Sequence, residues 1–130
     1  MVHVLTFEEV LDIHEALIEE YSDMRPGLDK PEALRAALSM HERGKFYDGG
    51  DLAERAALLG AGILLRQVFV DGNHRTAWVA MRTFLALNGH RIGGRSEELL
   101  DFLHEYYDSP NSTHRPTDLS AWLRSRLQRL

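Results

Sequence analysis

The residues best suited to chemistry are five in a row, Asp71-Gly72-Asn73-His74-Arg75, between two apolar stretches of this 130-residue chain. If a helix begins at Asn73 or His74, its first amide groups have no partner within the helix and point into the turn. Those donors and the helix dipole attract an anion, and Gly72 lets an oxygen-bearing ligand approach the backbone. The segment is therefore a candidate phosphate-binding turn.

Arg75 and Asp71 supply the charges of such a site. Arg75 falls in the first helical turn, and its planar, two-pronged guanidinium suits phosphate. Asp71 is unfavourable beside an anion unless a divalent ion lies between them, and Mg²⁺ is held by one carboxylate plus phosphate oxygens. On spacing alone, an ordinary turn fits as well, with Asp71 as a cap and Arg75 in solvent.

Two helices must hold this turn, and the hydrophobic spacing predicts both. Residues 52–66 are apolar almost all round, and Gly60 and Gly62 would let another backbone approach closely. Residues 73–88 carry a second apolar surface and stop at Asn88-Gly89. We expect a central buried helix pair that flanks the turn.

Start signals predict four further helices, which makes the expected fold an all-α bundle of about six helices in a single domain spanning 1–130. The signals are the capping box of Thr6 and Glu9 before residues 7–21, Asp29 and Pro31 before a helix that closes near Gly44, Ser96 before a helix through Tyr106, and Thr117 before a helix to the chain end.

Composition excludes several classes of protein. The chain has no cysteine, so disulfides and thiolate metal clusters are impossible, and a reducing interior is expected. A net charge of −5 argues against direct nucleic-acid binding. The longest apolar run, residues 56–65, is shorter than the ~20 residues that cross a bilayer, and no targeting segment is evident. We expect a cytoplasmic protein that binds no membrane.

The stretch from Gln67 to Ala77 resembles the Fic/Doc family signature, which reads His-x-Phe-x-(Asp/Asn)-(Gly/Ala)-Asn-(Lys/Gly)-Arg between two buried helices and continues Thr-Ala in Doc-type members. Flanking segments are also similar to the Doc-type (death-on-curing) pattern, so the resemblance covers nearly the whole chain. The matching positions are Phe69, Asp71, Gly72, Asn73, Arg75, Thr76 and Ala77, with His14-Glu15, Ala56-Ala57 and residues 84–89 outside the signature.

The resemblance implies a small helical transferase that binds ATP with Mg²⁺ and modifies a hydroxyl side chain of another protein. In the Doc toxin branch the group is phosphoryl and the target is a translation elongation factor, whereas most Fic proteins transfer AMP. By position, Asp71 would hold Mg²⁺, Gly72 and Asn73 would contribute to the nest around the phosphates, and Arg75 would bind phosphate. Phe69 would anchor the loop in the core.

The resemblance also implies partners. Many Fic proteins carry an inhibitory helix ending in Glu-(Gly/Asn), but no glutamate here is followed by glycine or asparagine. Inhibition would therefore come from a separate antitoxin protein, as in the toxin–antitoxin modules of the Doc branch. Residues 44–50, GKFYDGG, fall where relatives have a flap that aligns the target, although an ordinary loop is an equal alternative.

Two positions depart from the signature. Gln67 replaces the histidine that takes the proton from the attacking hydroxyl, and an amide is no base near neutral pH. Loss of a general base typically costs ~10² to 10⁴ in rate. His74 stands where Doc-type members have lysine; it could bind phosphate as a cation, although the helix N-terminus disfavours its charged form. His74 could also replace the missing base, but its reach is doubtful.

Three functions remain open: a Doc-type phosphotransferase toxin weakened at Gln67, a catalytically silent nucleotide- or anion-binding module, and an AMP transferase. The other histidines show no metal-ligand spacing, and a structural hydrogen bond is the expected role of His14. Arg124, Arg126 and Arg129 are expected to form a solvated basic face near the C-terminus, open to an acidic antitoxin segment.

Overall fold

The computed structural model of the chain describes residues 2–44, 51–108 and 115–130, and these fold as an α-helical bundle with one short pair of strands. The predicted all-α class is confirmed. The predicted flap, residues 44–50, lies outside the described residues apart from Gly44. The elements are α1 Phe7–Glu20, α2 Pro31–Arg43, α3 Leu52–Arg66, α4 Asn73–Leu87, β1 His90–Ile92, α5 Ser96–Asp108, α6 Pro116–Arg126 and β2 Leu127–Arg129.

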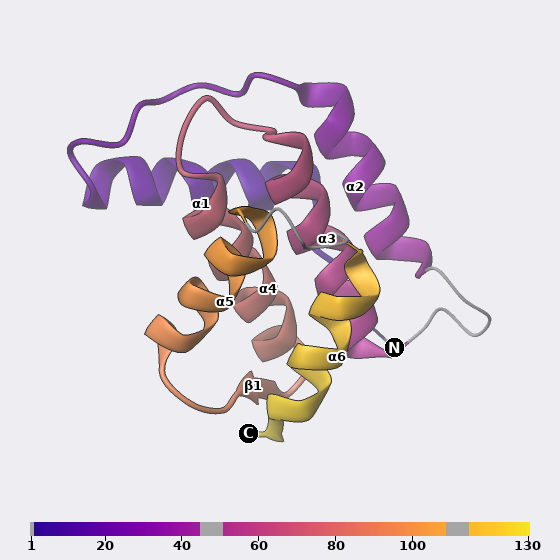
Figure 1. The fold of residues 1–130 in the computed structure, drawn as a ribbon. Coiled ribbons are helices and arrows are strands. Elements are labelled where there is room, and N and C mark those ends of the chain that lie inside the picture. Colours follow the sequence, from indigo (N-terminus) through magenta and orange to yellow (C-terminus); the bar gives the residue numbers. More distant parts are fainter. Residues whose placement is uncertain (1, 45–50, 109–114) are drawn as a thin grey trace.

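Helix α3 is the centre of the molecule, with α2, α4 and α6 packed around it (Figure 1). It is buried on nearly every side, as its continuous apolar sequence predicts. The predicted close approach of another backbone is confirmed at Gly62, where an added Cβ would lie 3.3 Å from the Ala37 Cα, and is corrected at Gly60, whose neighbour is a side chain. A Cβ on Gly60 would lie 2.4 Å from the Met81 sulfur, and one on Gly62 would lie 2.5 Å from the Ala37 Cβ.

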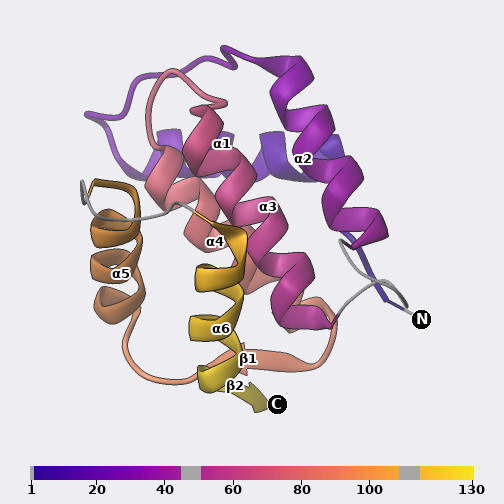
Figure 2. The ribbon, with the colours of Figure 1, turned by 45° about the vertical axis from the view of Figure 1, so that its right-hand side comes forward.

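Helices α3 and α4 run side by side in opposite directions and are joined by residues 67–72, which we call the motif loop (Figures 1 and 2). The motif loop lies at one end of this pair, at the top in both views. The two strands and both chain termini lie toward the other end. The predicted arrangement of a central helix pair flanking the motif is confirmed.

The end of the chain corrects a prediction. The helix predicted to run to the chain end, α6, stops at Arg126, and Leu127 begins β2. Strand β2 pairs antiparallel with β1, with Ile92 opposite Leu127. The amide of Gly93 also donates to the carbonyl of Arg126 at 2.7 Å. Hydrogen bonds to a distant strand therefore replace those of a further helical turn.

The start of α2 is also corrected. Asp29 does not cap this helix; Lys30 is the N-cap residue and Pro31 the first helical residue. The amides of Asp29 and Lys30 both donate to the carbonyl of Val68 at 2.9 Å. Residues before α2 are thus held extended against the motif loop. Ser96, predicted as a cap, is the first residue of α5. Thr117, predicted to cap the last helix, lies inside α6, because Arg115 is the N-cap residue and Pro116 the first helical residue.

Several other local signals are confirmed. Thr6 and Glu9 form the expected capping box of α1, and the Asp51 carboxylate accepts from the amide of Glu54 at the start of α3. Gly89 follows α4 in the left-handed conformation, with φ +79°. Within the described ranges, the search for a helix long and apolar enough to cross a membrane finds none.

The expected solvated basic face at the C-terminus is only partly present. Arg124 makes a two-pronged contact with Asp51, with Nε to Oδ2 at 2.6 Å and Nη2 to Oδ1 at 3.1 Å. Arg126 pairs with Glu98 at 2.8 Å. These two arginines tie α6 to the start of α3 and to α5, which leaves less free charge for a partner.

Candidate functional site

The motif loop begins and ends in left-handed backbone. Gln67 closes α3 with φ 49°, and Gly72 precedes α4 with φ +76°. Glycine adopts this conformation without steric cost. A Cβ at Gly72 would also lie 2.0 Å from the methyl carbon of Met24. Gly72 therefore lets the backbone turn and lets Met24 pack on it, whereas the sequence suggested room for a ligand oxygen.

The side chain of Asn73 holds the motif loop closed. Its Oδ1 accepts from the amide of Phe69 at 3.0 Å, and its Nδ2 donates to the carbonyl of Phe69 at 2.9 Å. The loop also pairs with the segment before α2, through a β-bridge between Leu28 and Phe69 and a bond from the Val70 amide to the Gly27 carbonyl. Because the side-chain oxygen and nitrogen of Asn73 are already bonded to Phe69, the group that Asn73 can offer a ligand is its backbone amide.

Phe69 anchors the loop, as the resemblance implied. Its side chain is 2% exposed and stacks on the ring of His14, with ring centroids 3.9 Å apart and planes 7° apart. The Nε2–H of His14 donates to the carbonyl oxygen of Asp71 at 3.0 Å. The structural role predicted for His14 is confirmed, and α1 thereby fixes the backbone on which Asp71 lies.

The carboxylate of Asp71 is held by two backbone amides. Its Oδ2 accepts from the Arg25 amide and its Oδ1 from the Gly72 amide, each at 2.9 Å. The Arg25 amide is the main cause of a lowered pKa of Asp71, and the Gly72 amide lowers it further. Asp71 is thus an ionised, oriented carboxylate, and each oxygen retains a lone pair for a cation.

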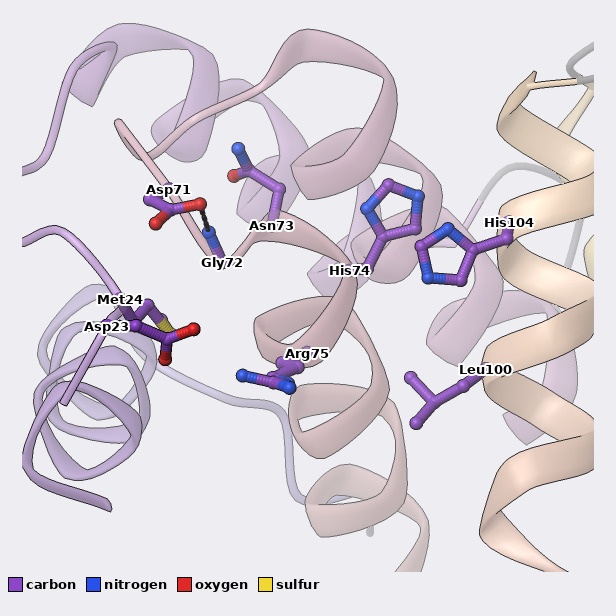
Figure 3. A pocket seen from close by; sticks show the side chains of 9 residues that line it. All are labelled: Asp23, Met24, Asp71, Gly72, Asn73, His74, Arg75, Leu100 and His104. Atoms are coloured by element: carbon purple, nitrogen blue, oxygen red, sulfur yellow. Dashed lines mark hydrogen bonds between the residues drawn. The ribbon is translucent and has the colours of Figure 1, made fainter. Parts of the chain in front are cut away.

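Asp71 and Arg75 open onto one cavity of about 330 Å³, near the lower end of the range for small-molecule sites. Figure 3 shows the first turn of α4 in the middle, with Asp71 on one side and the histidine pair on the other. The guanidinium carbon of Arg75 lies 3.8 Å from the centre of the Tyr21 ring. The lining residues are Asp23, Met24, Asp71, Gly72, Asn73, His74, Arg75, Leu100 and His104.

The start of α4 offers free donors to this cavity. Among the described residues, no side chain caps the helix, because its N-cap residue is glycine. The amides of the first turn and the dipole of a buried, fifteen-residue helix therefore favour an anion. With the Arg75 guanidinium and the Asp71 carboxylate nearby, the donor set fits a phosphate and a hard divalent ion.

The opposite side of the cavity is made by α5. His74 lies against His104, with ring centroids 4.2 Å apart, and lies edge-on to Tyr107 at 5.5 Å. Burial and the nearby His104 lower the pKa of His74. A neutral ring accords with the doubt that His74 binds phosphate as a cation.

Gln67 lies outside the cavity lining, and its side-chain amide donates to the hydroxyl of Tyr107. Because His74 also contacts Tyr107, the two positions that depart from the family signature meet at one tyrosine. The side-chain amide of Gln67 is thus already bonded to a hydroxyl of the protein itself.

Sequence reasoning located one side of the site and missed the rest. The five consecutive residues 71–75 all line the cavity. Asp23, His104 and Tyr107 were missed, since they come from the α1–α2 connection and from α5, far away in sequence. No local spacing marks them.

Comparison with known proteins agrees with this geometry. A buried helix pair joined by the motif loop is the arrangement that the sequence predicted. The model of the Fic/DOC family matches residues 4–85, which is more than half of the chain. This chain therefore belongs to the Fic/DOC family. It is also similar to the Toxin Doc of Mycolicibacterium smegmatis, with 28% identity over 103 residues that cover 75% of this chain and 73% of that relative.

Proposed function

We propose that this protein is a Doc-type toxin that uses Mg·ATP to phosphorylate a hydroxyl side chain of a translation elongation factor, at a rate reduced or abolished by Gln67. The observation that carries the proposal is the convergence of uncapped α4 amides, the Asp71 carboxylate and the Arg75 guanidinium on one cavity. The likeness to a relative named Toxin Doc supports the toxin reading.

Each residue has a distinct part in holding the nucleotide. Asp71 would ligate Mg²⁺, and it is kept ionised and oriented by the amides of Arg25 and Gly72. The first amides of α4 and the guanidinium of Arg75 would bind the phosphates. Bound Mg·ATP supplies the phosphoryl group and spreads its developing charge. Asn73 and His14 act indirectly by fixing the loop backbone.

Gln67 limits the transfer step. Its amide can orient a hydroxyl by a hydrogen bond but cannot accept the proton near pH 7. Phosphoryl transfer depends mainly on positioning and charge stabilisation, so slow transfer remains possible without a base. An incoming target hydroxyl must also displace the hydroxyl of Tyr107 from Gln67.

An antitoxin is the proposed partner in the cell. The chain lacks the inhibitory glutamate pattern of self-inhibited Fic proteins, so restraint would come from a separate protein. Because Arg124 and Arg126 are already paired with Asp51 and Glu98, we do not assign the antitoxin contact to these arginines.

A catalytically silent nucleotide-binding module is the second candidate. The contact between Gln67 and Tyr107 favours it, because this contact fills the acceptor position without supplying a base. Both candidates predict Mg·ATP binding, and they differ in whether a histidine at position 67 creates activity.

The test is transfer from labelled ATP to a purified elongation factor by the wild-type protein and by Gln67→His. The proposal predicts label from the γ-phosphate and growth inhibition with Gln67→His, at a rate about 10² to 10⁴ above wild type. The double variant Gln67→His/Asp71→Ala should lose the label. Label from the α-phosphate would identify an AMP transferase instead. No label from either position, with binding intact, would favour the silent module.

A further inference from the structure

A cluster of three metal-ligating side chains lies between α4 and α5. His74 comes from the first turn of α4, and His104 and Asp108 lie four residues apart on one face of α5. One ligand atom from each lies within 4.8 Å of the other two. Figure 3 shows the two imidazoles facing each other, on the side of the cavity away from Asp71.

We propose that His74, His104 and Asp108 form a binding site for a transition-metal ion such as Zn²⁺. Two imidazoles and one carboxylate suit zinc, whereas Mg²⁺ prefers oxygen ligands alone. Three protein ligands would leave a fourth position for water. The site is separate from the magnesium position proposed at Asp71 and does not depend on the proposed function.

The spacing of His104 and Asp108 is close to that of two ligands in an ion site. The Nδ1 of His104 lies 3.6 Å from the Oδ2 of Asp108, and ligand atoms ~2.1 Å from a tetrahedral ion lie about 3.4 Å apart. The rings of His74 and His104 are stacked with their planes 15° apart, so one ring must turn before both nitrogens can face the same ion. The side chains of His104 and Asp108 are more than half exposed, which leaves His104 free to make this rotation. An i, i+4 pair on a helix presents both ligands in one direction.

His74 supplies an independent observation. Its Nε2 is buried and has no hydrogen-bond partner within the described part of the chain. A buried polar atom without a partner is unfavourable, and a metal bond would relieve that cost. Nothing else in the described structure uses this nitrogen.

A bound ion would link α5 to the first turn of α4. His74 and His104 also line the cavity proposed to bind nucleotide. The ion would therefore lie at the side of this cavity formed by α5 and would add positive charge near the proposed phosphate-binding turn. The ion would thereby fix the helix that carries Tyr107, the residue in contact with Gln67.

The experiment is calorimetric titration of the chelator-treated, full-length protein with Zn²⁺, in the absence of nucleotide. We expect one ion per chain, and Co²⁺ in its place should give the visible absorption of a four-coordinate site. His104→Ala and Asp108→Asn should each weaken binding at least ~10-fold. His90→Ala is the matched control, because this histidine lies on β1 outside the cluster, and it should leave the Kd within about twofold.

Two results would overturn the proposal. One is the absence of binding at ~1 mM Zn²⁺, which corresponds to a gain below about 4 kcal/mol. The other is an equal loss of affinity in His104→Ala and His90→Ala, which would mean scattered surface binding. Since His104 and Asp108 are exposed, their variants should keep the wild-type circular dichroism, so lost binding cannot be ascribed to unfolding.

Discussion

The two sides of the cavity proposed to bind nucleotide are built in opposite ways. The loop wall, formed by Asp23, Met24 and residues 71–73, is fixed by hydrogen bonds between side chains and backbone that involve His14, Asn73 and Asp71. The helix wall, formed by His74, Leu100 and His104, is held by ring contacts, and His74 keeps a buried nitrogen without a partner in the described residues.

Because of this difference, we expect the two walls to serve different steps, nucleotide binding and catalysis. The loop wall carries the residues that match the family signature, and its backbone is arranged before any ligand arrives, which reduces the cost of binding. The helix wall lies beside Gln67 and Tyr107, where the chain departs from that signature. Nucleotide binding should therefore depend on the loop wall, and the altered catalytic step on the contacts of α5.

The largest effect on stability is expected when the loop wall is opened. Asn73→Ala removes two hydrogen bonds and leaves the partly buried amide and carbonyl of Phe69 without partners, at a cost of about 2–4 kcal/mol. The matched change on the helix wall, His104→Ala, should cost less than about 0.5 kcal/mol. Urea unfolding of both variants measures the contrast. Equal losses would show that the walls do not differ.

Arg75→Ala should give the next largest effect, on affinity. Loss of a charge-assisted phosphate contact should raise the Kd for Mg·ATP about 10- to 100-fold. Arg82→Ala is the matched control, because Arg82 lies two turns along α4 and its guanidinium carbon is 5.2 Å from the Trp78 ring centre. Calorimetry should show an unchanged Kd for Arg82→Ala. A similar loss in both variants would point to general charge rather than a site.

The pH dependence of stability should also differ between the buried histidines and the loop wall. Burial lowers the pKa of His41 below its ordinary value of 6.5. Its Nδ1–H donates to the Arg55 carbonyl and its Nε2 accepts from the Leu5 amide, so the folded state needs the neutral ring. His74 on the helix wall also has a lowered pKa. The unfolded chain therefore takes up protons that the folded chain does not.

The free energy of unfolding should have its full value above pH 6.5. It should fall as the pH decreases from 6.5, by at most about 1.4 kcal/mol per pH unit for each histidine. His74→Gln should keep most of this slope, since the more deeply buried His41 remains. The contribution of Asp71 on the loop wall should be lost only at lower pH, from about 3.8 downward, because the unfolded chain then takes up a proton at Asp71 while the folded chain, with its lowered pKa, still keeps the charge. Chemical unfolding at several pH values measures this, and stability that rises on acidification would contradict it.

The smallest effect is expected at the edge of the loop wall. Arg25 and Asp71 form an ion pair with Nε and Oδ2 3.9 Å apart, but the Arg25 side chain is 72% exposed. Arg25→Ala should therefore change stability by less than about 0.5 kcal/mol, because the backbone amide of residue 25 still holds the carboxylate. A loss comparable to that of Asn73→Ala in urea unfolding would mean that the side chain, not the amide, orients Asp71.

Local features of the sequence predicted most of the helices and one side of the site. The limits of α3 follow from the Asp51 cap and the end of its apolar run, and residues 71–75 share a cavity because they are consecutive. The end of α6 could not be predicted in this way, because Leu127 continues a helical pattern and only pairing with β1 makes it a strand.

The remaining errors have the same origin. Asp29 has the chemistry of a helix cap, but its segment pairs with the motif loop and Lys30 becomes the N-cap residue. His104 and Tyr107 reach the site only because α5 packs on α4, which no short pattern encodes. Contacts between segments distant in sequence decided each of these positions.

The central claim is that the phosphate-binding turn is intact while the catalytic position is altered. Titration of the wild-type protein and Gln67→His with Mg·ATP tests it most directly. The account predicts saturable 1:1 binding with Kd values that agree within about twofold, because Gln67 lies outside the cavity. The absence of binding to both proteins at ~1 mM nucleotide would contradict it.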